Sequence, residues 1–283
     1  MNIWYLPVDS IAGAATKFPV GALFRKGGKL IATATWTLDG GNGIDDYLVI
    51  ATSRGELAVY QGTDPSSSSA WALVGVYSVG EPLGRNPFCL FGGELLYLST
   101  VGLFPISKLA QSAVLDRSAA VSFKIDGAFL DAAAAYKNNT AWQVVSYPSG
   151  NMLIANIPTA DTPTSEQYVM NTITKSWCRF TNWDASYWTV MNGELYFSSG
   201  TKTYKAWTGT SDAGTPIQGS VMQAYSLLGT SSQKHVELVR PVISVTASAN
   251  IRYALDADFS ALGDYLSITY INSLSLWDSA LWG

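Results

Sequence analysis

Short stretches in which apolar and polar residues alternate follow one another along most of the chain, and clusters of Gly, Asn, Asp and Ser separate them. Alternation with a period of two, combined with many Val, Ile, Thr, Tyr and Trp residues, predicts strands, and the small polar clusters predict turns. The strands expected in the first 210 residues are Leu30–Thr37, Tyr47–Thr52, Glu56–Gln61, Trp71–Val79, Glu94–Ser99, Ala141–Tyr147, Met152–Ile157, Glu166–Asn171, Ser176–Phe180, Tyr187–Met191, Glu194–Ser199 and Thr203–Trp207. The pattern therefore predicts a mainly β fold.

One region in the middle of the chain has a helical pattern instead. Ser107–Ala110 and Ser118–Tyr136 carry Leu, Ala and Phe at helical spacing, and the run of alanines has a high helix propensity. Gly127 disfavours a single continuous helix, and Asn138-Asn139 predict its end. We therefore expect a helical insertion at about residues 107–136.

The sequence changes character after Gly209. Ser211–Thr215 is small and polar and predicts a linker. Further strands are expected within Val236–Thr246, Ile251–Leu255 and Tyr265–Ile271. We accordingly expect one domain over residues 1–210 and a C-terminal β segment over residues 211–283 that contacts neighbouring subunits.

A weak internal repeat favours one β architecture over others. Phe91–Ser99 and Met191–Ser199 share a turn with glycine followed by Glu and a strand, and Arg54–Tyr60 is a shorter copy. The first two of these turns along the chain lie 38 residues apart, close to the ~40–50 residues of a propeller blade. Tyr168–Trp177 has the form of a kelch-like hairpin. The repeat predicts a β-propeller-like domain, with a β-sandwich as the alternative.

Composition excludes several classes of protein. Charged residues make up only 13% of the chain and aromatic residues 12%, whereas a typical soluble protein has about 25% charged residues. Such a chain is neither disordered nor a coiled coil. The net charge of −4 argues against a surface that grips phosphates, which needs clustered Lys and Arg. No apolar run approaches the ~18 residues of a membrane helix, and the N-terminus lacks the features of a signal peptide.

Few residues suggest metal or nucleophile chemistry. Cys89 and Cys178 lie in apolar runs and are predicted to be small buried hydrophobic residues, although a disulfide stays possible. His235 is the single histidine, so neither a zinc site nor a Ser-His-Asp triad is expected. Gly27-Gly28-Lys29 lacks the hydroxyl residue of a phosphate-binding loop. We expect no cofactor.

The most acidic loop is a weak candidate for an ion site. Asp39, Asn42, Asp45 and Asp46 offer oxygen atoms of the type that Ca²⁺ prefers. Their spacing does not match an EF-hand, so a glycine-rich hairpin loop with solvated carboxylates is the alternative.

Paired carboxylates could also serve a glycosidase. The available residues are Asp45, Asp46, Asp64, Glu56, Glu94 and Glu194. Because the three Glu residues occupy the same position in the repeated turn, we expect a structural role for them and no catalytic residue. The high aromatic content leaves a carbohydrate-binding or glycan-cleaving propeller as the alternative function.

Two Leu-Trp pairs near the C-terminus predict a contact surface. Leu276, Trp277, Leu281 and Trp282 would favour aggregation if they were exposed. We expect them to dock either on the chain's own core or on a neighbouring subunit.

Several segments together resemble tail proteins of tailed bacteriophages, and most closely the tail nozzle family of podoviruses. The segments that carry the resemblance are Trp36–Asp46, Gly55–Pro65, Trp71–Tyr77, Gly80–Arg85, Glu166–Asn171, Trp177–Phe180 and Lys205–Thr210. The helical insertion continues the match, so the resemblance covers nearly the whole chain.

The resemblance implies a structural protein of the virion tail. It implies a homo-hexameric ring with β-propeller domains that contacts the adaptor and the tail fibre or spike, and that retains the genome and passes it without binding it specifically. The family carries no catalytic residue. Its members are longer at the N-terminus, so the propeller expected here is either incomplete, completed by another chain or built differently.

Overall fold

A computed structural model describes residues 1–7, 9–39, 44–111, 116–160, 164–209, 211–212, 215–216, 219, 225–240, 242–243, 249–256 and 266–270. The chain divides into two compact units, Met1–Gly209 and Thr210–Gly283. Strands dominate and the helices lie in the middle of the first unit, so the prediction of a mainly β fold is confirmed. The described strands form several small antiparallel sheets, among which no closed barrel or propeller is present.

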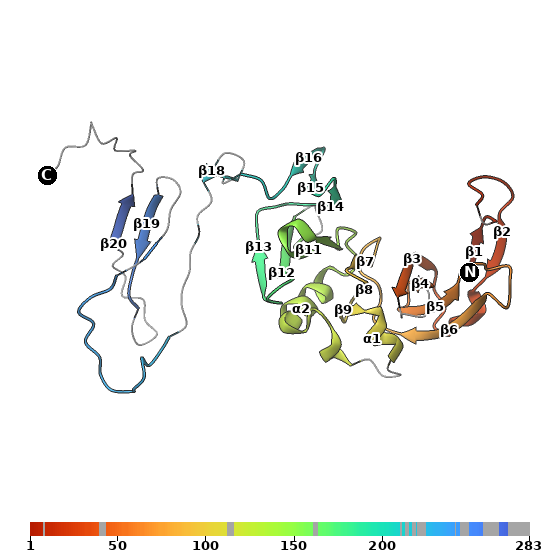
Figure 1. The fold of residues 1–283 in the computed structure, drawn as a ribbon, viewed down its shortest axis with the longest axis horizontal. Coiled ribbons are helices and arrows are strands. Elements are labelled where there is room, and N and C mark those ends of the chain that lie inside the picture. The colour runs from red at the N-terminus through yellow and green to blue at the C-terminus, as the bar shows by residue number, and fades with distance from the viewer. Residues whose placement is uncertain are drawn as a thin grey trace. The chain divides into compact units, whose positions relative to one another are not determined.

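Sheets that follow one another along the chain build the first unit (Figure 1). The first sheet contains β3 (Leu30–Asp39), β4 (Ile44–Thr52), β5 (Glu56–Gly62) and β6 (Trp71–Ser78), and the second sheet contains β7 (Phe88–Phe91), β8 (Glu94–Ser99) and β9 (Gly102–Pro105). The third sheet contains β10 (Gln143–Tyr147), β11 (Met152–Pro158), β12 (Ser165–Asn171) and β13 (Trp177–Phe180). The fourth sheet contains β14 (Tyr187–Met191), β15 (Glu194–Ser199) and β16 (Lys202–Lys205). In each sheet the spatial order of the strands is their order in the chain, which is the meander that short turns impose.

The repeated sequence motif forms two-residue hairpin turns. Phe91 pairs with Glu94 between β7 and β8, and Met191 pairs with Glu194 between β14 and β15. The second turn has positive φ at both central residues, the conformation that Asn-Gly favours because it matches the twist of the flanking strands. The third copy, at Gly55, connects β4 to β5. Gly55 has φ +73°, and a Cβ there would lie 2.5 Å from the carbonyl oxygen of Val79.

Both faces of the inner sheets are buried, because consecutive sheets pack face to face. In β4, Val49 and Ala51 point to the core shared with the second sheet, and Ile50 between them points to the N-terminal segment. The second and third sheets share a core that includes Leu98 and Leu153. A further core with Trp188 and Leu195 joins the third and fourth sheets. The alternation of side chains along each strand thus supplies both neighbouring cores.

The helical insertion covers the second and third sheets. It contains α1 (Ile106–Gln111), two short 3₁₀ turns and α2 (Asp126–Tyr136). Phe129 and Ala133 of α2 pack in the core that contains Trp142. The observed insertion agrees with the prediction for residues 107–136, and α2 begins at Asp126, so Gly127 lies in its first turn. No helix in the described part of the chain has the length and apolar content that a membrane span requires.

Several short elements were not predicted. β1 (Asn2–Tyr5) and β2 (Thr16–Pro19) form an N-terminal hairpin, and β7 and β9 are strands of four residues that sequence patterning passed over. Each of these strands pairs over only four positions with one neighbouring strand, so its sequence shows little of the alternation that predicts a strand. Tertiary pairing, more than local pattern, makes them strands.

The second unit differs from the prediction in two places. The expected linker contains the short pair β17 (Ser211–Asp212) and β18 (Thr215–Pro216). β19 (Ala249–Tyr253) pairs with β20 (Leu266–Tyr270), close to the expected positions. The strand expected within Val236–Thr246 is wrong for the described residues 236–240 and 242–243, because no described strand pairs with them.

Candidate functional site

The predicted ion loop lies at the tip of the β3–β4 hairpin. The backbones of Asp39 and Asp45 lie in the ladder of these strands, and Asn42 lies outside the described residues. The carboxylate of Asp46 accepts a hydrogen bond of 2.8 Å from the Thr37 hydroxyl. In the described residues no group of three or more His, Cys, Asp or Glu side chains could hold a metal. The ion site stays a prediction.

The C-terminal contact residues cannot be placed. Leu276, Trp277, Leu281 and Trp282 lie outside the described residues. Their role at an interface stays a prediction.

The three Glu residues of the repeated turns each bind local groups. The buried carboxylate of Glu56 accepts hydrogen bonds from the backbone N–H groups of Arg25 (3.0 Å) and Lys26 (2.8 Å). Glu94 accepts from the backbone N–H and the hydroxyl of Ser107. Glu194 pairs with Lys205 at 3.0 Å, which raises the pKa of that lysine through the hydrogen bond. These contacts tie turns to neighbouring segments, as a structural role requires.

The two cysteines lie in different surroundings. Cys89 is buried, and burial raises the pKa of its thiol from the ordinary value of 9.0 to about 11. The prediction that Cys178 is buried is wrong: it is exposed, because β13 is the outer strand of its sheet and the described residues leave Cys178 uncovered, although it lies opposite the buried Val169. Both are free thiols. His235 is exposed in a segment outside any described strand.

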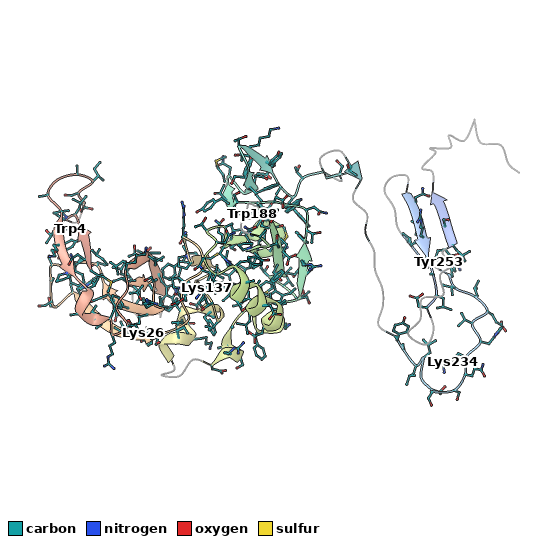
Figure 2. The ribbon with its side chains drawn as sticks, turned by 180° about the vertical axis from the view of Figure 1, so that it is seen from behind. Trp4, Lys26, Lys137, Trp188, Lys234 and Tyr253 are labelled. Carbon is teal, nitrogen blue, oxygen red and sulfur yellow. The ribbon has the colours of Figure 1, made fainter. Side chains whose placement is uncertain are left out.

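A small polar cleft lies between turns of the first three sheets. It has a volume of about 150 Å³ and includes Glu81, Lys137 and Thr100 in its lining. The Glu81 carboxylate lies 3.6 Å from the charged nitrogen atoms of both Arg54 and Lys137. Figure 2 labels Lys137, which follows α2. These side chains are 40–63% exposed. Solvent therefore screens the two ion pairs, and we expect them to contribute little to the free energy of unfolding although they connect three loops of the chain.

A buried amide cluster fixes the connection between the third and fourth sheets. The Gln143 side chain donates to the carbonyl of Trp188 (2.8 Å) and accepts from its N–H (2.7 Å), as a neighbouring strand would. Asn156 donates to the carbonyls of Ala141 and Ala185 and accepts from the indole N–H of Trp188. Gln167 donates to Asn156 at 2.9 Å. In this way polar side chains hold the start of β14 against β11.

Sequence reasoning missed this amide cluster, although the sequence contained a signal. Asn156 interrupts an otherwise apolar strand of the third sheet, and Asn is depleted in strands. An Asn or Gln in such a run is retained when its side chain has hydrogen-bond partners in the interior.

The second and fourth sheets differ at their outer edges. Leu103 of β9 donates its N–H to the Ser122 hydroxyl (3.0 Å) and accepts from the N–H of Val121 (2.8 Å). The helical insertion therefore closes the edge of the second sheet. β16 is the outer strand of the fourth sheet, all of its residues are exposed, and no described residue pairs with its outer side. This edge is a template for another strand.

The described part of the second unit exposes many large apolar side chains. Leu227, Leu228, Leu238 and Val242 are 70%, 71%, 80% and 90% exposed. Figure 2 draws the segment that carries Lys234 as an open, curved loop. Exposed apolar residues in such number are typical of surfaces that another molecule covers.

Comparisons with protein-family models, curated proteins and solved structures return no match to this chain.

Proposed function

We propose that this chain is a structural subunit of a bacteriophage tail that assembles into a ring and works as a tail nozzle, retaining the genome and conducting it during ejection. The proposal combines the resemblance of segments such as Trp36–Asp46 to nozzle proteins with the physical character of the two units. It assigns the protein a role in assembly and assigns no reaction to any residue.

The finer fold that we propose is an open arc of β-propeller blades. Each sheet of the first unit is a meander, and successive sheets stack through both faces, as blades do. The first strands β7, β10 and β14 of three successive sheets approach one another, which is the arrangement near a propeller axis. The pairing of β12 with β13, which places Trp177 opposite Met170, supports the kelch-like hairpin that the sequence predicts.

The observation that carries the assembly proposal is the exposed apolar surface of the second unit. Fully burying a leucine contributes about 1.5–3 kcal/mol, and the exposed leucines and valines described above make no such contribution in the isolated chain. A ring of identical subunits would bury this surface in contacts that repeat around the ring.

The acidic net charge of the chain suits a channel for DNA. With a charge of −4, the protein would repel phosphates on average and so would not retain passing DNA by adhesion. Salt-dependent DNA binding of the purified protein measures this property. We expect weak binding at physiological salt, and tight binding there would contradict a conduit role.

The oligomeric state of the full chain tests the proposed function. We expect native mass spectrometry and light scattering to give a closed oligomer of about six copies, and electron micrographs to show rings. Removing residues 276–283 should weaken the ring while the sheets of the first unit stay folded. A chain that stays monomeric at all concentrations, or that releases reducing sugars from a glycan at a saturable rate, would overturn the proposal.

A further inference from the structure

The fourth sheet of the first unit has room for one more strand at its outer edge. We propose that residues 234–240 of a second copy of this chain add to β16 as that strand. The inference rests on the proposed function, because it names the contact through which neighbouring copies of the ring would meet.

The first argument is the difference between this edge and the others. The described strands of the first and third sheets number four, ending at β6 and β13. The second sheet has three described strands, and Val121 and Ser122 bind its outer edge through Leu103. The fourth sheet also has three, and none of its hydrogen bonds within the described residues extends beyond β16. Among these sheets it alone lacks both a fourth strand and a cover.

The second argument is the surface beside this edge. Tyr204 lies opposite Phe197 in the β15–β16 ladder, and their rings stack with centroids 5.3 Å apart. Trp207, just after β16, stacks on Phe180 at 5.9 Å. Tyr204 and Trp207 are nevertheless 43% and 54% exposed. On this face, therefore, the aromatic core of the fourth sheet continues to the edge and ends there uncovered.

The third argument is the pattern of the proposed partner. Residues 234–240 read Lys-His-Val-Glu-Leu-Val-Arg, lie outside any described helix or strand, and form no backbone hydrogen bond with another described residue. In a strand, Val236 and Leu238 would share one face and Glu237 would take the other. The centre of the first face, Val236 and Leu238, matches the exposed Tyr204. Glu237 would then lie on the same side as Lys205, which also pairs with Glu194. Opposite charges on neighbouring strands favour such pairing.

The fourth argument is that the same chain contains both the segment that would be added, residues 234–240, and the sheet edge that would receive it, β16. The described residues of each copy contain one such open edge and one such segment, so the two form a heterologous contact. When contacts of this kind close into a ring, every edge receives a strand and every segment finds an edge. Strand addition supplies main-chain hydrogen bonds, and the side chains on alternate positions supply specificity.

Disulfide formation between variants that each carry one introduced cysteine tests the contact directly. All variants carry Cys178→Ser, which removes the exposed thiol and leaves the buried Cys89 in place. Chains with Glu237→Cys are co-expressed with differently tagged chains that carry Thr203→Cys or Lys205→Cys, on the face that Glu237 should share. Lys202→Cys is the matched control, because it lies in the same strand but points to the opposite face.

After mild oxidation with diamide we expect mixed-tag disulfide dimers for Glu237→Cys with Thr203→Cys or Lys205→Cys, and few with Lys202→Cys. Equal yields for all three pairs, or dimers for none, would overturn the inference. If rings still form by light scattering without these dimers, the strand contact is wrong and the proposed function stands. If the chain is monomeric, both are wrong. A disulfide that forms only when both cysteines are in one chain would show that the segment pairs with its own edge, and would also overturn the inference.

A second measurement uses two exposed leucines of the second unit. Leu238→Ser should weaken association about tenfold or more, since a leucine on the covered face loses its burial. Leu227→Ser is the control, because Leu227 is also exposed but lies outside residues 234–240. We expect a smaller loss for the control, because Leu227 would be covered in the ring but would not lie in the added strand. An equal loss of association in both variants would mean general stickiness and would contradict strand addition.

Discussion

Both units of the chain contain apolar runs that predict strands, but the units differ in what their apolar residues contact. In the first unit, residues such as Val49, Leu98 and Leu153 are fully buried between stacked sheets. In the second, leucines and valines of similar size are largely exposed in the described residues. The difference indicates that the first unit gains its stability within the chain, whereas in our proposal the second would gain stability from contacts with neighbouring copies. A pair of leucine substitutions tests this comparison most directly.

Leu98→Ala should have the largest effect on the free energy of unfolding. Leu98 is fully buried in the core between the second and third sheets, so truncation should cost about 2–5 kcal/mol. Leu238→Ala, the matched control in the second unit, should change the unfolding free energy of the dilute chain by less than about 0.5 kcal/mol. Denaturant unfolding monitored by tryptophan fluorescence measures both. Similar losses in the two variants would break the distinction between the units.

Asn156→Ala should be nearly as destabilising although the residue is polar. The substitution leaves the indole N–H of Trp188 and the carbonyls of Ala141 and Ala185 buried without Asn156 as their partner. We expect a loss of about 2–4 kcal/mol in the same assay. Asn86 is exposed and accepts one long, partly buried hydrogen bond of 3.4 Å from the N–H of Phe88, so Asn86→Ala should cost less than about 0.5 kcal/mol. A small loss for Asn156→Ala would mean that the amide cluster does not hold the fourth sheet.

Glu56→Ala should lower the free energy of unfolding more than Glu194→Ala does, because the first carboxylate is buried and the second is exposed. Glu56 is only 4% exposed and accepts two backbone N–H groups, so its removal should cost about 2–3 kcal/mol. Glu194→Ala removes an exposed ion pair with Lys205 and should cost less than about 1 kcal/mol. Thermal unfolding of the two variants gives the order. The reverse order would show that these turns are not stabilised by their carboxylates as the contacts indicate.

Raising the pH into the alkaline range should lower the free energy of unfolding of the first unit. Burial raises the pKa of Cys89 to about 11 from 9.0, and burial together with the charge of Glu81 raises the pKa of Tyr97. The neutral forms are therefore favoured in the folded state, so this stability is complete below pH 9 and declines as the pH rises to 11 and beyond.

The contribution of Cys89 to the loss of unfolding free energy at alkaline pH can be measured by substitution. Between pH 8 and 11, Cys89→Ala should lose less unfolding free energy than the unmodified chain, by about 2 kcal/mol at most. Denaturant unfolding at several pH values gives both slopes, and Cys178→Ser serves as the exposed control. Identical slopes for the chain and for Cys89→Ala would contradict burial of this thiol.

The sequence by itself determined which segments form most strands of the first unit, and for three of them it also determined the bounds. Glu94–Ser99, Tyr187–Met191 and Glu194–Ser199 were predicted with the bounds that the structure has, because hairpin turns such as Asn192-Gly193 are coded by local residues. The position of the helical insertion followed in the same way from helix propensity and from the Asn residues after it.

Only the tertiary structure decided which faces and edges of those strands are covered. Cys89 and Cys178 lie in similar apolar runs and both on edge strands, yet Cys89 is buried in the core shared by the second and third sheets, whereas Cys178 on β13 is exposed. The closed edge of β9 and the open edge of β16 differ through Val121 and Ser122 of the distant insertion. Burial and edge pairing depend on residues far apart in the sequence, and no local pattern specifies them.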